Sequence, residues 1–540
     1  MKTLNNKQFL FTCLLFTFLS ISQVAFSQFS PGSTLYGSDI KVTSESNAFN
    51  MNSKISVAGN GWIYVLENNN IGSVSGSWHI FCSKNQGRSF SYLTGLDFNS
   101  GNGKLMDADL VVTGNDSASI VLFVAFLVSH QSSGTDPSYC LVDRIDAAGN
   151  ALGGKAFVCG NNRMSFVSIA TDFRSPDLVT SHPFSVVVSW TWSDLDNYND
   201  NLSYACSSDG GTTWVDPIIL YTVPSPGWLG KTSISIGNAG PAFKAAFGIA
   251  FELTDATHAG QIGVIVDFLH MEGNWLNPTI MGFDADAIIN KNPVICMKQC
   301  TPAYPAENQV SVLVAYEHYS GGKYHINYGY IDYQFLNSGC DQAASSDFFM
   351  YTLNPTGTSP EKQPHIALDK GNDKYLLTWL STNNNDLLLA AIPTLQPSVV
   401  QDYGNYRDLH SAFSTDPLPR VDINQVNGKA CFSWIETDAD GQNVYFDSQW
   451  ADMGIPGNHV NLPCNDLIVY PNPARGKVFV DYSGKGSAVA SLSTISDTDV
   501  LEFIVANGKN AFDVSNLPNG LYVIKVVGEK GVFAGKFIKQ

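Results

Sequence analysis

Residues 202–214 have the sequence LSYACSSDGGTTW, and this stretch decides the fold. Its first five residues predict a strand, and the rest have the composition of a tight turn. The Asp209 side chain can accept hydrogen bonds from the amides of its own turn, and Gly211 can adopt a left-handed backbone. The ring of Trp214 can anchor the hairpin. The stretch therefore predicts a β-strand that ends in a short turn bonded to itself.

A weak repeat surrounds this stretch between residues 53 and 452. Each unit has a short apolar strand, a turn, and a second strand that ends in a large side chain. The large side chains at these ends are Leu66, Phe126, Trp190, Phe251, Tyr316, Trp379 and Trp434. They are separated by 60, 64, 61, 65, 63 and 55 residues. A period as regular as this predicts that one small unit is repeated, either around a ring or along a line.

Residues 365–379 indicate what the unit is. An apolar run, a Gly/Asn/Asp turn and a second apolar run follow one another there, which is the pattern of a β-hairpin. The second strands are nearly all apolar, so both of their faces must be covered, as neighbouring blades cover them in a propeller. Long helical patterns are absent. We predict an all-β protein with a β-propeller of seven blades, or of six if the first and last units share a blade.

The turn after residue 206 carries a recognisable motif. Residues 207–214 fit the Asp-box pattern S-x-D-x-G-x-T-W, and residues 83–90 are a decayed copy with Asn for Asp and Phe for Trp. The residues at the fixed positions of the intact box are Ser207, Asp209, Gly211 and Trp214. The middle of the chain therefore resembles the sialidase-like Asp-box (BNR repeat) β-propellers. In that family the boxes are structural and lie away from the catalytic face, so the resemblance implies a fold and no chemistry.

The last part of the chain carries two motifs and a basic-apolar-basic end, Lys536 to Gln540. The motif residues are Tyr470, Pro471, Asn472, Pro473, Leu517, Pro518, Gly520 and Tyr522. Prolines suit the edge or start of a strand, and Pro followed by Gly suits a turn. Residues 464–540 resemble the type A C-terminal sorting domain of the type IX secretion system of Bacteroidetes-like bacteria. That resemblance implies a small β-sandwich, a secretion-machinery partner, and a secreted or outer-membrane surface location. A β-sandwich without a sorting role is the alternative.

The other end of the chain agrees with export. Lys2 and Lys7 precede the apolar run 9–19, and small residues at 25–27 suit a signal-peptide cleavage site. We expect no transmembrane segment after signal removal. The expected parts are the signal peptide 1–27, an N-terminal extension 28–52 with a closing strand through 34–42, the propeller 53–452, the linker 453–463 and the sorting domain 464–540.

Charge and cysteine content narrow the function classes. The formal net charge of −18 opposes binding to nucleic acid and other polyanions. Ten cysteines include one in the signal peptide, so at least one of the remaining nine lacks a partner within the chain. Suggested bridges are Cys140 with Cys159, and Cys296 or Cys300 with Cys340. Free buried thiols are the equal alternative for Cys206 and Cys431.

A sialidase-like active site would need an arginine cluster for the substrate carboxylate, together with acidic and tyrosine partners. Only seven arginines are present, and the least implausible members of such a cluster are Arg163, Arg174 and Arg420. We assign none of them as catalytic, and the catalytic residues stay unknown.

Carboxylates recur just past the large strand-end side chains. They are Glu67, Asp194, Asp196, Glu252, Glu317 and Glu436. Equivalent positions in different blades end at one face of a propeller, so these acids could form a ring around the channel, and paired carboxylates can hydrolyse glycosides. The alternative is a set of solvated acids at strand ends.

Two acidic loops, residues 194–201 and 438–441, are candidate calcium sites because calcium prefers oxygen ligands. Neither has EF-hand spacing, and both read equally well as ordinary hairpin loops. The ten histidines show no metal-ligand spacing, so we predict no metal site and no cofactor, with calcium as the open alternative.

Two function classes remain. The first, which we favour because arginines are few, is a non-catalytic propeller that binds glycans or protein partners at the cell surface. The second is a sialidase-like exo-glycoside hydrolase. A purely structural surface protein is a third, weaker option.

Overall fold

The computed structural model contains strands and turns and no helix among the residues it describes. It describes residues 36, 38–43, 51–73, 75–99, 103–114, 116–129, 137–160, 162–171, 185–238, 245–255, 260–268, 279–281, 289–298, 309–335, 343–353, 359–369, 374–383, 385–394, 398–407, 413, 416–424, 428–449, 465–466, 469–494, 499–515, 517–528 and 531–540. The signal peptide, the linker 453–463, Arg174, Cys300 and Cys340 lie outside these residues. The chain divides into two compact units, Met1–Asp452 and Met453–Gln540.

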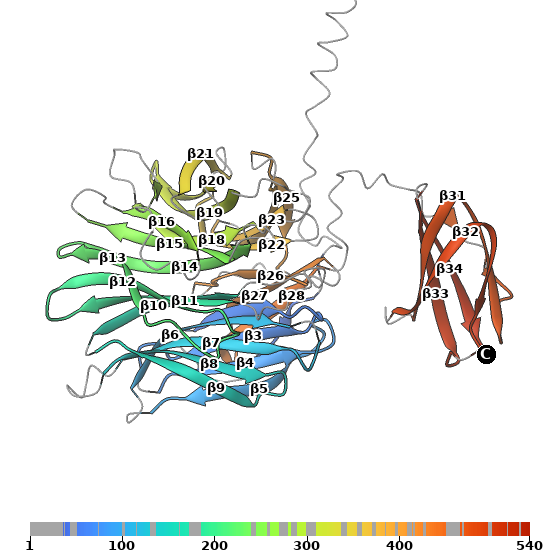
Figure 1. Cartoon of the computed structure of the whole chain (residues 1–540), viewed down its shortest axis with the longest axis horizontal. Helices are drawn as coiled ribbons and strands as arrows, with labels where there is room; N and C mark the ends of the chain where they lie inside the picture. Colours follow the sequence, from blue (N-terminus) through green and yellow to red (C-terminus); the bar gives the residue numbers. More distant parts are fainter. Residues whose placement is uncertain are drawn as a thin grey trace, which may run out of the picture. The chain divides into compact units, whose positions relative to one another are not determined.

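Within the described residues, the strands of the first unit form seven sheets of four strands each, so the seven-bladed β-propeller is confirmed. Figure 1 labels many of these strands. Each blade is listed from its innermost to its outermost strand. Blade 1 consists of β2 (Asn52–Val57), β3 (Ile63–Asn69), β4 (Ser77–Ser83) and β5 (Ser91–Asp97), and blade 2 of β6 (Lys104–Thr113), β7 (Val121–Ser129), β8 (Tyr139–Asp146) and β9 (Ala151–Val158). Blade 3 consists of β10 (Arg163–Thr171), β11 (Val186–Asp194), β12 (Asn199–Ser207) and β13 (Ile218–Pro224), and blade 4 of β14 (Trp228–Asn238), β15 (Ala245–Thr254), β16 (Gln261–Phe268) and β17 (Thr279–Met281).

Blades 5 to 7 continue the same order. They consist of β18 (Ile289–Met297), β19 (Gln309–Ser320), β20 (Lys323–Phe335) and β21 (Ala343–Thr352); β22 (Glu361–Asp369), β23 (Lys374–Ser381), β24 (Asp386–Pro393) and β25 (Gln401–Asn405); and β26 (Arg420–Asn424), β27 (Lys429–Asp438), β28 (Gly441–Ser448) and β1 (Ile40–Lys41).

The ring closes through the N-terminal part of the chain. The inner strands β2, β6, β10, β14, β18, β22 and β26 touch one another in that order, and β26 touches β2. The outermost strand of the last blade is β1, in which Ile40 pairs with Phe446 and Lys41 with Tyr445. The closing strand expected within residues 34–42 is therefore two residues long, extended by an isolated bridge from Tyr36 to Gln449.

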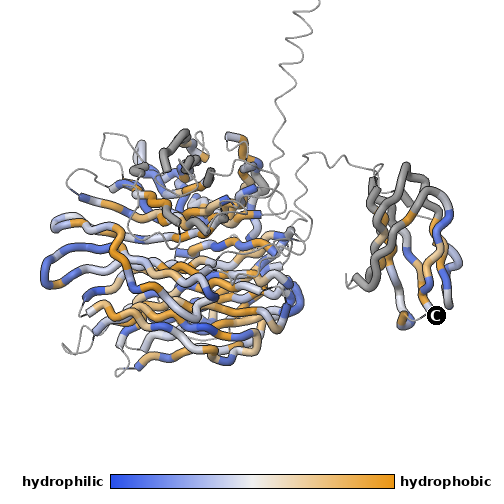
Figure 2. The backbone as a smooth tube through the Cα atoms, in the orientation of Figure 1, coloured by the Kyte–Doolittle hydropathy of each residue, from blue (hydrophilic) through white to orange (hydrophobic). Residues whose placement is uncertain are grey.

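The apolar second strands explain why the blades pack. Every residue of β3 and of β23 is buried, because each face of a blade meets a neighbouring blade. One such interface joins Phe157 of blade 2 to Trp190 of blade 3, whose rings stack 5.6 Å apart. Figure 2 shows apolar residues recurring along the strands of the propeller. At about 25 cal/mol per Å² of buried apolar surface, such interfaces supply the main stabilisation of the ring.

Hydrogen bonds also join successive inner strands. Side chains of one inner strand accept backbone N–H groups of the next: Ser56 from Val112, Asp107 from Val167, Asp109 from Ile169, Ser168 from Ile234, Ser233 from Ile295, Ser235 from Met297, His365 from Val421, and Asp422 from Val57. Where one strand makes two such bonds, the residue numbers of the two acceptors and of the two donors rise in the same direction along their strands. Neighbouring inner strands therefore run parallel. All inner strands therefore begin at one face of the ring, which we name the upper face, and end at the lower face.

The second unit is a small all-β domain with its own core. Its strands are β29 (Asn465–Asp466), β30 (Val469–Tyr470), β31 (Lys477–Thr494), β32 (Asp499–Asp513), β33 (Gly520–Gly528) and β34 (Gly531–Lys539). The long strand β31 pairs with β32 along one edge, and with β30 and then β33 along the other. The buried side chains between these strands include Val478, Leu492, Ile524 and Phe537.

Candidate functional site

A cavity of about 250 Å³ runs through the centre of the ring, lined by the inner strands of all seven blades. Its walls are mostly aliphatic, with Ile55, Ile234 and Val421 among them. Near the upper face the lining becomes charged, because β2, β14 and β26 each bring a basic residue close to their first residues. We name this charged end the channel mouth.

Three cations meet at the channel mouth: Lys54, Lys231 and Arg420. Lys54 forms an ion pair with Asp109, with 3.2 Å between Nζ and Oδ1. The Arg420 side chain is only 2% exposed; its terminal nitrogens donate to the Pro419 carbonyl at 3.2 Å and to Asn52 at 3.4 Å. Its Nε has no hydrogen-bond partner among the described residues.

Lys231 is the second cation without a carboxylate partner in the described part of the chain. Its Nζ donates to the Asn292 side-chain oxygen at 3.4 Å, a neutral acceptor. Burial and the positive charges of Arg420 and Lys54 lower the pKa of Lys231 to about 7, against the opposing effect of the nearby carboxylates of Glu252 and Glu317. Burial and the same cations hold the pKa of His365 well below its usual range, so its neutral ring can accept the Val421 amide. The mouth therefore brings three cations together, and among the described residues only Lys54 forms a direct ion pair with a carboxylate.

The strand-end carboxylates Glu252 and Glu317 are not solvated, so that expectation was wrong for them: both are buried. Glu252 accepts the backbone N–H of Asn292 at 2.7 Å, and Glu317 accepts that of Gln363 at 2.8 Å and the Asn292 side chain at 2.7 Å. Asn292 and Gln363 have φ values of 51° and 57°, at β-bulges in the inner strands β18 and β22. Each carboxylate thus holds the strained bulge of the next blade.

The two remaining glutamates of this set are buried as well, again against the expectation of solvated acids. Glu436 forms a two-pronged ion pair with Arg407, with distances of 3.2 Å to Nε and 2.6 Å to a terminal nitrogen. This pair joins blade 7 to the end of blade 6. Glu67 lies 3.5 Å from the Nδ1 of His79, within blade 1. The acids therefore serve separate blade contacts and do not form one ring around the channel.

Three carboxylates of the acidic loops, those of Asp194, Asp438 and Asp440, already have partners among the described residues. Asp194 accepts the amides of Asp196 and Asn197, and the Asn197 side chain at 2.7 Å, which lowers the pKa of Asp194. Asp438 and Asp440 both lie within 3 Å of the Lys41 ammonium, at 2.8 and 2.9 Å. Within the described ranges, no three His, Cys, Asp or Glu side chains are placed to hold a metal ion.

Of the three candidate arginines, only Arg420 is at the channel among the described residues. Arg163 is exposed at the start of β10, and Arg174 lies outside the described residues. Lys54 and Lys231 were not predicted from the sequence as residues of the site. Each is a lone cation within an inner strand of the repeat, and this position was the signal that could have identified them.

The intact Asp box lies at the lower face, between β12 and β13. The Ser207 hydroxyl donates to Asp209 at 2.8 Å and accepts the Gly211 amide at 2.8 Å. Asp209 accepts the Thr213 amide at 2.8 Å and its hydroxyl at 2.7 Å; although desolvation opposes ionisation, these bonds lower the pKa of Asp209 to about 2. Trp214 donates to the Gly211 carbonyl at 3.1 Å.

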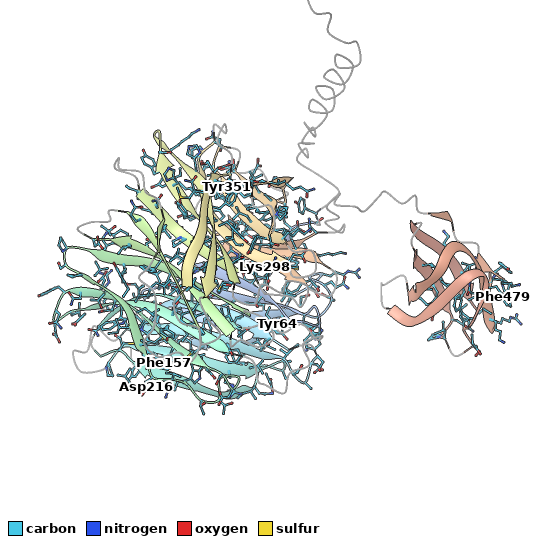
Figure 3. The ribbon with its side chains drawn as sticks, turned by 45° about the horizontal axis from the view of Figure 1, so that its top comes forward. Tyr64, Phe157, Asp216, Lys298, Tyr351 and Phe479 are labelled. Carbon is cyan, nitrogen blue, oxygen red and sulfur yellow. The ribbon has the colours of Figure 1, made fainter. Side chains whose placement is uncertain are left out.

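The box also packs against the preceding blade. A Cβ on Gly211, which has a φ of 78°, would lie 2.6 Å from the Phe123 ring of blade 2, so only glycine fits. The Trp214 ring packs edge-on against Phe157 (Figure 3, where Phe157 and the nearby Asp216 are labelled). The box therefore fastens blade 3 to blade 2.

The decayed box of blade 1 keeps the same design. The Gly87 amide donates to Ser83 at 2.9 Å, and the Ser89 amide donates to Asn85 at 3.1 Å. A Cβ on Gly87 would lie 2.1 Å from the Phe446 ring of blade 7. Phe90, in the place of the tryptophan, also contacts Phe446, with centroids 4.9 Å apart.

The suggested Cys140–Cys159 bridge is not formed. Both thiols are free, and the residue paired with Cys140 across the hairpin is Phe157. Cys206, Cys296 and Cys431 are buried, and no disulfide joins them within the described residues, which agrees with the alternative of buried thiols for Cys206 and Cys431.

In the second unit, the first motif is tied to the last strand. The Asn472 side chain accepts the Ile538 amide at 2.9 Å and donates to the Lys536 carbonyl at 3.2 Å. The second motif closes on itself, because the Tyr522 hydroxyl donates to the Pro518 carbonyl at 2.9 Å. The Tyr522 ring stacks on Phe537 of the last strand, 5.6 Å away. Both motifs therefore converge on β34 (Figure 3 labels Phe479 in this unit).

Residues 468–540 match the family model described as secretion system C-terminal sorting domain. The second unit is a sorting domain. It belongs to the type IX secretion pathway, so the protein is secreted to the extracellular space or the cell surface. No helix in the described ranges is long and apolar enough to cross a membrane.

No curated protein matches this sequence. Among solved structures, the chain is similar to a GH93 α-L-arabinofuranosidase of Fusarium graminearum, at 10% identity over 76% of this chain and 97% of that one, with a TM-score of 0.41. It is also similar to the NanB sialidase of Streptococcus pneumoniae, at 9% identity over 80% and 72% of the two chains, with a TM-score of 0.36. A GH62 hydrolase gives 9% identity over 78% and 99%, with a TM-score of 0.30.

Proposed function

We propose that this secreted propeller is a non-catalytic binding module that holds an acidic group of a glycan or protein ligand at the channel mouth. The observation that carries the proposal is that two cations at the mouth lack a direct ion pair within the described part of the chain. Lys231 and Arg420 have no carboxylate partner among the described residues, whereas the nearby Glu252 and Glu317 are engaged by backbone amides.

Electrostatics supports an anionic ligand. A buried cation that is not directly paired is costly, and one Arg420 nitrogen has no hydrogen-bond partner among the described residues, although the carboxylates of Glu252, Glu317, Asp107 and Asp109 offset part of the positive charge. An anion that enters the channel mouth would relieve the repulsion between these cations and restore hydrogen bonds to Arg420. A carboxylate suits the planar guanidinium, and a sulfate or phosphate offers similar acceptors.

The engagement of the glutamates argues against hydrolysis. A glycosidase needs one carboxyl group that donates a proton and a second that acts as base or nucleophile, both facing the substrate. Glu252 and Glu317 instead face the bulges at Asn292 and Gln363 and stabilise the ring there. Turning either side chain toward a substrate would leave a strained backbone amide without its acceptor.

The alternative is a sialidase-like exo-glycoside hydrolase, and one observation favours it. Burial raises the pKa of Glu252 despite its amide hydrogen bond and the nearby Lys231. A carboxyl group with a raised pKa could act as a general acid at neutral pH. Under this alternative, Glu252 would be the proton donor and the cations would hold the substrate carboxylate.

A glycan array run beside a sialoside hydrolysis assay separates the two functions. The purified full chain is compared with Lys231→Met, which removes the cation, and with Lys155→Met, a control on the exposed outer strand β9. Retained binding of acidic glycans without turnover, lost in Lys231→Met alone, would support the binding module. Turnover that Glu252→Gln abolishes would establish the hydrolase.

A further inference from the structure

A second cavity, of about 190 Å³, lies where the ring closes, between blade 7 and blade 1. Figure 1 shows the strands of these two blades side by side, and their inner strands β26 and β2 are in contact. The cavity is at the lower face, because its lining includes Asn424 at the end of β26 and Gln86 in the turn that follows β4. We name it the seam pocket, and it is separate from the channel mouth at the upper face.

The inner wall of the seam pocket is apolar. It is formed by Ile40, Ile63 and the Phe446 ring, together with the Cys431 side chain. Burial raises the pKa of the Cys431 thiol far above its usual range, so this side chain stays protonated and behaves as a small apolar group. An apolar cavity of about 150 Å³ is large enough for benzene. The seam pocket therefore has room for one small apolar body.

The rim of the seam pocket is polar and carries two cations, Arg88 and Lys429, and one carboxylate, Asp447. Asp447 is buried and accepts the Ser448 amide at 2.7 Å. Arg88 is exposed, and its guanidinium makes no hydrogen bond or ion pair within the described part of the chain. The rim therefore offers a planar set of hydrogen-bond donors to a molecule that enters the pocket.

Two of the rim residues stand at the variable positions of the decayed Asp box. The intact box has Gly210 and Thr212 where this box has Gln86 and Arg88. Gln86 has a φ of 61°, close to the 72° of Gly210, in a backbone region that disfavours every residue with a Cβ. The fold of the turn does not need a side chain there. A strained residue whose side chain lines a pocket is the kind of outlier that points to a binding role.

We infer that the seam pocket binds a small organic carboxylate that has an apolar body. The Arg88 guanidinium can hold the carboxylate through two parallel hydrogen bonds, and the Gln86 amide can donate a third. The apolar body fills the space between Ile63 and Phe446. A free acid and the C-terminal residue of a peptide both present this chemistry, so the ligand can come from either source.

The lining disfavours other ligand classes. A sugar ring would place hydroxyl groups against Ile40, Ile63 and Phe446, where they find no hydrogen-bond partner. An inorganic anion would leave the apolar wall uncovered. The Asp447 carboxylate opposes a ligand with several negative charges, because like charges repel across a pocket of this size. One carboxylate on an apolar body satisfies all three conditions.

The test is a titration of the full chain followed by saturation-transfer difference NMR. The probes are 4-methylpentanoate and its neutral match 4-methylpentanamide, and the tripeptide acetyl-glycyl-glycyl-leucine and its C-terminal amide. A pocket that holds so few atoms binds weakly, so we expect a dissociation constant of about 1 mM for the acids. The pocket variants are Arg88→Met and Gln86→Gly. The matched control is Lys84→Met, which removes an exposed cation of the same turn that is not part of the lining.

We expect Arg88→Met to weaken binding of the acids about tenfold, because the paired hydrogen bonds are lost. Gln86→Gly should weaken it a few-fold without lowering the thermal midpoint, because glycine suits the left-handed backbone. A purely structural role of Gln86 would not separate binding from stability in this way. Lys84→Met should bind the acids like the wild type. Thermal melts of all variants exclude unfolding as the cause of a loss.

Three results would overturn the inference: equal binding of the acids and their amides, unchanged binding in Arg88→Met, or no binding of any probe. Lys231→Met shows whether the acids bind at the channel mouth instead. Loss of binding in that variant, with full binding in Arg88→Met, would refute the seam pocket and leave the proposed function standing. If the tripeptide acid binds at least as tightly as the free acid, the source is a peptide C-terminus. Binding of the free acid alone assigns a small molecule.

Discussion

The lower and upper faces of the propeller satisfy their polar groups in different ways. At the lower face, the Asp box bonds to itself within eight residues, from Ser207 to Trp214. At the upper face, Glu317 bonds to Gln363 and Glu436 bonds to Arg407, which are 46 and 29 residues away in sequence. A turn that bonds to itself can tolerate a substitution, as the decayed box of blade 1 shows. A hydrogen bond between two blades is kept only if both blades keep their positions. The upper face should therefore be the more fragile one.

The largest effect is expected from breaking the buried Arg407–Glu436 pair. Arg407→Met leaves the Glu436 carboxylate buried without its counter-charge, and removal of one partner of such a pair costs about 3–5 kcal/mol. Urea denaturation of the full chain measures the change in the free energy of unfolding. Arg163→Met, at an exposed position, is the control. A cost below about 1 kcal/mol would mean that blades 6 and 7 hold together without this pair.

A smaller loss is expected when the Glu317 carboxylate is removed. Glu317→Ala frees the Gln363 amide, which is held in a left-handed conformation, and the Asn292 side chain. Two buried hydrogen-bond donors without acceptors should cost about 2–3 kcal/mol in the same assay. The exposed Asp196→Ala variant serves as the reference. Equal stability of the two variants would contradict the role of Glu317 at the bulge.

At the lower face, Asp209→Asn converts the intact box toward its decayed form. The Asn85 geometry of blade 1 indicates that most turn bonds survive this change, so the loss should be about 1 kcal/mol. Asp209 has a lowered folded pKa, so its contribution is present above the unfolded pKa near 4 and is lost as the pH falls toward about 2. The variant should therefore lose less stability than the wild type between pH 4 and 2. Parallel pH profiles would refute this.

The smallest effect on ligand binding is expected at the channel mouth, where the charge of Lys231 depends on pH. The pKa of Lys231 is lowered to about 7, so between pH 7 and about 10 the unfolded chain binds the extra proton. Wild-type stability should thus rise relative to Lys231→Met across that window. Binding of polygalacturonate should weaken a few-fold from pH 6 to 8 in the wild type, because the Lys231 charge is lost, and should stay flat in Lys231→Met. Arrays at the two pH values test this, and a flat wild-type profile would remove Lys231 from the site.

The sequence predicted what depends on local or periodic patterns. The regular spacing from Leu66 to Trp434 predicted a propeller of seven blades, with six as the alternative, because each apolar second strand must be covered on both faces, and the structure has seven sheets among its described residues. The fixed spacing of the tail motifs was enough to identify the sorting domain. Both signals are short-range, so they survive in a single sequence.

The contacts between blades could not be predicted from the sequence. The bulges that turn Glu252 and Glu317 toward the next blade have no local signature, so these acids were expected in solvent or in a ring. The meeting of Lys54 with Arg420 joins residues that are far apart along the chain but adjacent once the ring closes. A cation in an otherwise apolar inner strand is the pattern to look for.

The two-residue closing strand has a mechanical consequence. β1 and β28 are antiparallel, and the bridge from Tyr36 to Gln449 lies where the chain enters β1 and leaves β28. A force pulling these two chain ends apart would meet the pairs one after another, as a zipper opens, and would not load them together in shear. The first pair to yield would be Tyr36 with Gln449, followed by Ile40 with Phe446. The closing strand β1 should therefore separate from β28 at low force, and the ion pairs of Lys41 with Asp438 and Asp440 would be the last contacts to break.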